Sequence, residues 1–142
     1  MENKNILLID DDRDFVHSTK AFLEGRGYVV DTAFNGAEGL GKIRAGKTDL
    51  IVLDIMMDHD AEGFNLAYEL RQDDARRKIP IVIVSGFSQH LSDKMDNFQF
   101  ILGQDWPADA FLEKPINLKE LAKTIDRILP KTGGQIAAAQ EN

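Results

Sequence analysis

Short runs of aliphatic residues are the feature that most constrains the fold of this chain. A strand with one face in water alternates apolar and polar residues, whereas a strand buried on both faces of a parallel sheet is apolar throughout. Five short apolar runs occur, and three of them do not alternate; they lie at residues 6–9, 28–30, 50–53, 79–84 and 110–112. The sequence therefore predicts a parallel sheet that is covered on both faces.

The segments between these runs carry apolar residues at helical spacing, on residues 15–23, 37–43, 64–70 and 118–128. The second segment contains Gly39 and Gly41, which we expect to interrupt its helix. The last is the clearest, because Asn117 can cap it, with Glu120 three residues on, and Pro130 ends it. Strand and helix alternate along the whole chain, which predicts an α/β doubly wound parallel sheet of five strands with right-handed crossovers.

Length and composition fit one globular domain, which we place at residues 1–130. The chain has 142 residues, of which 43% are hydrophobic and 29% charged. Residues 131–142 contain two glycines and one large apolar residue, so we expect a disordered tail. The absence of cysteine excludes disulfides and thiolate metal sites. No apolar run is long enough to cross a bilayer or to form a signal peptide, so we expect a cytoplasmic protein.

The net charge of −7 argues against nucleic acid as a partner, because binding to a polyanion depends on lysine and arginine contacts with phosphates. The one compact basic cluster, at residues 76–78, directly follows two acidic residues. We interpret it as the solvated end of a helix.

Carboxylates gather where the predicted strands end. Asp10, Asp11 and Asp12 follow the first run directly, and Asp54 ends the third. Ligands of such sheets bind beyond the carboxyl ends of the strands, so Asp10, Asp11 and Asp54 converge if the first and third strands are neighbours. Oxygen ligands without histidine or cysteine suit a hard ion such as Mg²⁺. Taken alone, each aspartate is explained as well by a turn or an N-cap, and we expect Asp12 to be a cap.

A hydroxyl and a lysine extend this pattern. Ser85 ends the fourth run, and Lys114 and Pro115 follow the fifth. An ammonium and a hydroxyl can each bind a phosphate oxygen. Neither residue is informative alone. Together with the carboxylates they describe a site for moving a phosphoryl group onto a carboxylate, where catalysis is mostly positioning and charge neutralisation.

These motifs resemble the receiver domain of two-component response regulators. The matching stretches are residues 6–12, 49–57, 80–86 and 111–115, and the resemblance runs from residue 6 to 129. It implies a flavodoxin-like, CheY-like fold with strand order 2-1-3-4-5. It also implies a single-domain signalling switch, with no effector domain following, whose output is a contact with another protein.

The resemblance also implies roles for individual residues. Asp54 would accept the phosphoryl group, Asp10 and Asp11 would bind Mg²⁺ together with Asp54, and the Met56 backbone carbonyl would be a further ligand. The donor would be a histidine kinase or a phosphotransfer protein. A downstream protein would receive the signal, with neither nucleic acid nor membrane as partner. The chain would not be an enzyme, and would support only its own phosphorylation and dephosphorylation.

Three further roles follow from the same resemblance. Ser85 would couple phosphorylation to a conformational change, and Lys114 would hold the phosphoryl group, with the peptide bond to Pro115 in the cis form. Phe111 stands where the family often has a tyrosine that acts as the switch residue. A phenylalanine can still change rotamer but cannot form a hydroxyl hydrogen bond.

Two stretches depart from the family pattern. The loop after the acceptor has Asp58 where proline is usual, and it carries an extra residue before Gly63. His59 in this loop is better explained as a solvated residue than as a metal ligand. The long, partly apolar segment 86–113 enlarges the connection to the fifth strand. It either pads an enlarged fourth helix and loop or reshapes the signalling face, and both alternatives stay open.

The resemblance places Met56 and Phe87 beside the path of the hydrolytic water. Both side chains are bulky and apolar, and neither can orient water, so we expect slow self-dephosphorylation.

Three other functions are weighed against the receiver. A pseudo-receiver that only docks would normally have degraded sites, whereas the acids, hydroxyl and lysine are all here. A haloacid-dehalogenase-type phosphatase needs a second acid two residues after its nucleophile, where this chain has Met56. A flavodoxin-like FMN protein needs a phosphate-binding loop after the first strand, where three aspartates would repel phosphate.

Overall fold

The computed structural model describes residues 3–54, 62–85 and 108–129, and within these ranges it does not place the side chains of Glu62, Phe64 and Ser85. The predicted tail at 131–142 and most of the long segment 86–113 lie outside these ranges. None of the helices in the described ranges is long and apolar enough to cross a membrane.

Five strands form one all-parallel sheet in the order β2-β1-β3-β4-β5. The strands are β1 (Asn5–Ile9), β2 (Val29–Ala33), β3 (Leu50–Asp54), β4 (Ile81–Ser85) and β5 (Ala110–Glu113). The predicted α/β doubly wound sheet is therefore confirmed, and so is the strand order that the family resemblance implied.

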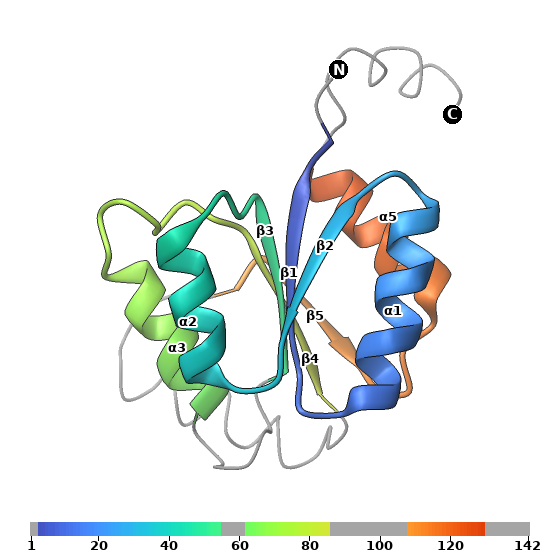
Figure 1. Cartoon of the computed structure of the whole chain (residues 1–142), viewed down its shortest axis with the longest axis horizontal. Coiled ribbons are helices and arrows are strands. Elements are labelled where there is room, and N and C mark those ends of the chain that lie inside the picture. Colours follow the sequence, from blue (N-terminus) through green and yellow to red (C-terminus); the bar gives the residue numbers. More distant parts are fainter. Residues whose placement is uncertain (1–2, 55–61, 86–107, 130–142) are drawn as a thin grey trace.

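Helices cover both faces of this sheet (Figure 1). One face carries α2 (Gly36–Ala45) and α3 (Glu62–Arg71), and the other carries α1 (Arg13–Gly25) and α5 (Leu118–Ile128). Alternate residues of β1 serve the two cores: Leu7 and Ile9 pack towards α2 and α3, whereas Ile6 and Leu8 pack towards α1 and α5. This two-sided burial explains why the sequence of β1 is apolar from Ile6 to Ile9.

Side-chain caps lie at the starts of α1 and α5, as the sequence predicted. Asp12 accepts a hydrogen bond from the Phe15 N–H at 3.1 Å, and Asn117 accepts one from the Glu120 N–H at 3.1 Å. Each cap satisfies one of the N–H groups that the first helical turn leaves without a partner. Both predicted caps are confirmed.

Three details differ from the predictions. The strand predicted at 28–30 is β2, which runs further because its edge position lets it carry the exposed Asp31 within the strand. Neither Gly39 nor Gly41 interrupts α2, and Gly39 lets the helix approach β1, since a Cβ there would lie 2.5 Å from Ile9 Cδ1. The basic residues 76–78 form a turn after α3 rather than the end of a helix, with Arg76 paired to Asp73 at 2.8 Å.

Candidate functional site

Two central strands bring the acidic residues together at one edge of the sheet. Because β1 and β3 are neighbours with Ile9 opposite Leu53, the residues that come next, Asp10 and Asp54, reach the same level. Asp10 is fully buried and Asp54 is 3% exposed. The carboxylates of Asp10, Asp11 and Asp54 each place an oxygen within 4.8 Å of the others.

Lys114 reaches this cluster from the turn after β5. Its Nζ lies 2.8 Å from Asp10 Oδ2 and 3.7 Å from Asp54 Oδ2. Burial of the ammonium lowers the pKa of Lys114, but the hydrogen bond to Asp10 and the charges of Asp54, Asp10 and Asp12 outweigh it, so the net pKa is raised above its ordinary value. The peptide bond between Lys114 and Pro115 is cis.

Backbone contacts hold Asp10 in place. Its N–H donates to the Ala33 carbonyl at the end of β2, at 3.1 Å. Its Oδ1 accepts a hydrogen bond from the Asp12 N–H at 2.9 Å, and Asp12 in turn caps α1. The acidic turn is therefore tied both to the neighbouring strand and to the start of the helix.

The chemistry of these donors fits a hard divalent cation. Among the described residues, the three carboxylates lie beside one ammonium, that of Lys114, so negative charge is in excess there when all four groups are ionised. Asp10 Oδ2 is buried, and within the described ranges its partner is the Lys114 ammonium at 2.8 Å. Oxygen donors with excess negative charge suit Mg²⁺, which usually takes one or two protein carboxylates and completes its coordination with waters and phosphate oxygens.

Two aromatic contacts at this edge were not foreseen from the sequence. The Lys114 Nζ lies 4.6 Å from the centroid of the Phe15 ring, and the Arg13 guanidinium lies 4.1 Å from that of Phe34. The sequence assigned Phe15 only to the apolar stripe of its helix. Its spacing of three residues from the cap Asp12 was a signal that its ring would lie near the acidic turn.

The remaining predicted site residues are only partly described. Ser85 ends β4 and pairs with Glu113 in register, so its backbone lies at the same edge of the sheet. Phe111 is half-buried and packs against the core beneath α2 and α3. Met56 and Phe87 lie outside the described residues, as do Asp58 and His59.

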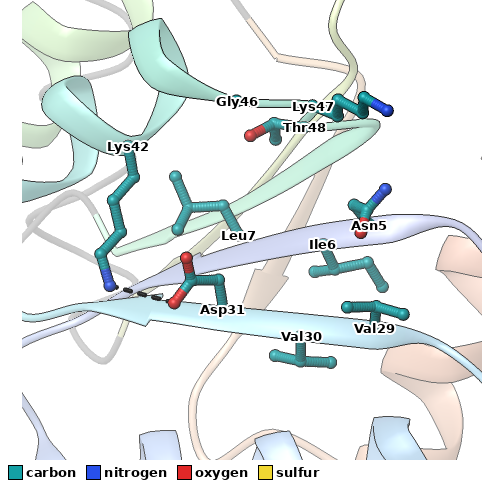
Figure 2. Close-up of a pocket in the computed structure, with 10 residues that line it drawn as sticks. All are labelled: Asn5, Ile6, Leu7, Val29, Val30, Asp31, Lys42, Gly46, Lys47 and Thr48. Carbon is teal, nitrogen blue, oxygen red and sulfur yellow. Dashed lines mark hydrogen bonds and ion pairs between the residues drawn. The ribbon is translucent and has the colours of Figure 1, made fainter.

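A separate hollow of about 400 Å³ lies near the opposite ends of the strands (Figure 2). Its walls include Asn5 at the start of β1, Val29 at the start of β2, and Lys47 after α2. Lys42 and Asp31 form an ion pair there at 3.0 Å. The hollow contains none of the predicted site residues.

The parallel sheet of this order, with an acidic cluster facing a lysine at its carboxyl edge, defines the class of CheY-like receivers. The family model described as "Response regulator receiver domain" matches residues 6–126, and the chain belongs to this family. The family is one of signalling proteins rather than catalytic ones. The predicted identity as a receiver of two-component systems is confirmed.

Named relatives agree with this assignment. The alkaline phosphatase synthesis transcriptional regulatory protein PhoP of Bacillus subtilis is 35% identical over 136 residues, which cover 96% of this chain and 52% of PhoP. The response regulator ArlR of Staphylococcus aureus is 30% identical over 124 residues, covering 87% of this chain and 52% of ArlR. The chain thus spans about half the length of these relatives.

Solved structures show the same fold. A CheY-like receiver domain protein from Methanospirillum hungatei has a TM-score of 0.75 and 33% identity, covering 90% of this chain and 94% of that one. The response regulator TrrA from Thermotoga maritima, in complex with Mg²⁺ and BeF, has a TM-score of 0.73 and 32% identity, covering 89% and 99%.

Proposed function

We propose that this receiver is switched by phosphorylation of Asp54 with Mg²⁺ as cofactor. The observation that carries the proposal is the arrangement of charge around Asp54. Its carboxylate is almost fully buried, lies 3.7 Å from the Lys114 ammonium, and shares a cluster with Asp10 and Asp11. Each contact is of the kind that phosphoryl transfer to a carboxylate needs.

In the proposed reaction, a carboxylate oxygen of Asp54 attacks phosphorus in line with the bond to the donor. The donor is the phosphohistidine of a kinase or a phosphotransfer protein in the cytoplasm. The P–N bond breaks as the new P–O bond forms, and the histidine leaves with the electron pair of the broken bond. Mg²⁺, held by Asp10, Asp11, Asp54 and the Met56 carbonyl, would neutralise phosphate charge. Lys114 provides a fixed positive charge beside the acceptor.

The acyl phosphate adds about 1.5 to 2 negative charges at Asp54. Lys114 and the Ser85 hydroxyl would contact the new oxygens, and contacts made in only one state shift the population between two states. Phe111 packs half-buried on β5, next to β4, and it would move with this shift as the switch residue. The output is a contact between residues 1–130 and a downstream protein, in keeping with the net charge of −7.

Intact-mass spectrometry after incubation with Mg²⁺ and acetyl phosphate tests the proposal. One phosphoryl group should appear on the wild type and none on Asp54→Asn. Asp49→Asn is the matched control, because Asp49 lies next to the amino end of the same strand. Asp49 accepts a hydrogen bond from the Asn5 N–H at 2.7 Å, and asparagine keeps an oxygen that can accept it. This control should be phosphorylated like the wild type. A folded wild type that neither gains mass nor binds Mg²⁺ would instead be a pseudo-receiver.

The proposal includes a long-lived phosphoryl group, because Met56 and Phe87 offer no polar atom to orient the hydrolytic water. Met56→Asn should shorten the lifetime of the phosphorylated protein, measured as loss of the added mass after removal of the donor. Fast loss from the wild type, unchanged in Met56→Asn, would contradict this part of the proposal.

A further inference from the structure

In the part of the chain that the structure describes, the Lys114 ammonium lies close to two carboxylates and to one aromatic ring. It is closer to Asp10 (2.8 Å) than to Asp54 (3.7 Å), and the centroid of the Phe15 ring lies 4.6 Å away. The face of an aromatic ring carries negative potential and attracts a cation within about 6 Å of its centroid. The Lys114 side chain is only 20% exposed, so this attraction is less screened than it would be on an open surface.

Phe15 is held by the same turn that supplies the acids. Its N–H donates to Asp12, the cap of α1, and the Asp12 N–H donates to Asp10. The ring is half-buried, and it also packs at the margin of the core between α1 and the sheet. Its place relative to Asp10 is therefore set by backbone hydrogen bonds and by packing together.

A neutral ring differs from the carboxylates in one useful respect. Asp10 and Asp54 attract the ammonium, but they would also attract a divalent cation, which competes with Lys114 for their charge. The Phe15 ring attracts Lys114 without being a ligand for a hard cation. It can therefore hold the ammonium near Asp54 when the charge of the carboxylates is shared with another cation.

We propose that Phe15 is a positioning residue, whose ring holds the Lys114 ammonium beside Asp54. The inference rests on the proposed function, in which Lys114 neutralises charge at the acceptor. A leucine at this position retains much of the packing volume and loses the ring face, whereas a tyrosine retains the ring face. Phe22→Leu is the matched control, because Phe22 is a second half-buried phenylalanine of α1 that packs against the same core.

The first test measures Mg²⁺ affinity by calorimetry, without any phosphodonor. Phe15→Leu releases Lys114 more often from the cluster, so Mg²⁺ should bind more tightly, by up to about fivefold. Damage to packing alone would weaken binding or leave it unchanged. Phe15→Tyr and Phe22→Leu should bind Mg²⁺ like the wild type, and Phe15→Leu should have no further effect in a Lys114→Gln background.

The second test follows Lys114 itself by NMR. The ring current should shift its ε-methylene protons upfield in the wild type and in Phe15→Tyr, and the shift should disappear in Phe15→Leu.

The third test is the initial rate of phosphorylation by acetyl phosphate at saturating Mg²⁺, which should fall about fivefold in Phe15→Leu and recover in Phe15→Tyr.

The outcomes separate the two proposals. If the wild type is phosphorylated on Asp54 but Phe15→Leu matches Phe22→Leu in all three measurements, the positioning role of Phe15 is refuted and the proposed function stands. If the wild type is not phosphorylated, the function fails, whereas the Mg²⁺ affinities and the Lys114 shift still decide whether the ring holds the ammonium.

Discussion

Gly39 allows helix α2 to lie close to strand β1, and adding one methyl group there should show how tightly the sheet end beside the site is packed. A Cβ at this position would lie 2.5 Å from Ile9 Cδ1 and 3.1 Å from Ile9 Cγ1. Carbon atoms in contact lie about 3.5–4.0 Å apart, so Ile9 or the helix must move by about 1 Å. Ile9 is fully buried and directly precedes Asp10, so it has little room to yield.

The same helix provides a matched control. Gly41 is exposed, and a Cβ there would meet nothing within 4 Å. Both substitutions to alanine gain about 0.5–1 kcal/mol from helix propensity and from a less flexible unfolded chain. Only Gly39→Ala carries the cost of overpacking, about 1–3 kcal/mol. The two variants should therefore differ by about 1–3 kcal/mol in the free energy of unfolding, with Gly41→Ala above the wild type.

Urea denaturation of the wild type and both variants measures this difference. Ile9→Val removes Cδ1, the atom that clashes. Alone it should destabilise the fold by about 0.5–1.5 kcal/mol, but in the Gly39→Ala background it should cost less or stabilise. The reasoning is refuted if Gly39→Ala is as stable as Gly41→Ala, or if Ile9→Val costs the same in both backgrounds.

Three further predictions concern a cap, a buried phenol and the acidic cluster. Asn117→Ala should lower the free energy of unfolding by about 1 kcal/mol in urea, whereas Asn117→Ser, which keeps a capping oxygen, should lower it much less. Burial and, after it, a hydrogen bond to Asp126 raise the pKa of Tyr28 above its ordinary value. The free energy of unfolding of the wild type should therefore fall as the pH rises above about 10, where the phenol ionises in the unfolded chain, and it should fall less in Tyr28→Phe. Asp11→Asn should weaken Mg²⁺ binding in calorimetry, because it removes the charge of one of the three carboxylates that would hold the cation; an unchanged affinity would contradict this role of Asp11.

The central strands were predictable from the sequence because burial on both faces leaves each of them a run of consecutive apolar residues, with polar residues only at the ends. All five residues of β3 are buried, and four of the five in β1. The edge strand β2 is different. Its pattern mixes exposed and buried residues, since it is the outermost strand of the sheet in the described residues, and the apolar run at 28–30 marked only its beginning. Periodicity thus locates the buried part of a sheet better than its margins.

The continuity of α2 across its glycines has a related explanation. Helix propensity describes the isolated helix, where Gly39 is unfavourable. In the folded chain its missing side chain is what lets α2 approach Ile9, and that contact joins residues thirty positions apart. Such a partner cannot be inferred from local spacing. The same holds for the bond between Tyr28 and Asp126, which are 98 residues apart.

The candidate site was easier to foresee than the contacts that support it. In a parallel sheet, every residue that follows a strand lies at one edge, so Asp10, Asp54 and Lys114 had to lie at that edge once the strands were recognised. Which of them touch, and what else surrounds them, depends on side-chain directions. The sequence could not show that Lys114 lies nearer to Asp10 than to Asp54, or that Phe15 flanks it.

The position of Lys114 explains how the negative charge of the acidic cluster is partly balanced. Three carboxylates at the end of two buried strands repel one another, and the ammonium relieves part of this repulsion by pairing most closely with Asp10, the most buried of the three. A divalent cation that took over the charge of Asp10 would weaken this pair and leave Lys114 free to favour Asp54. The ammonium that partly balances the cluster would then become the charge that assists transfer, and its distances to its two carboxylate partners differ by only about 1 Å.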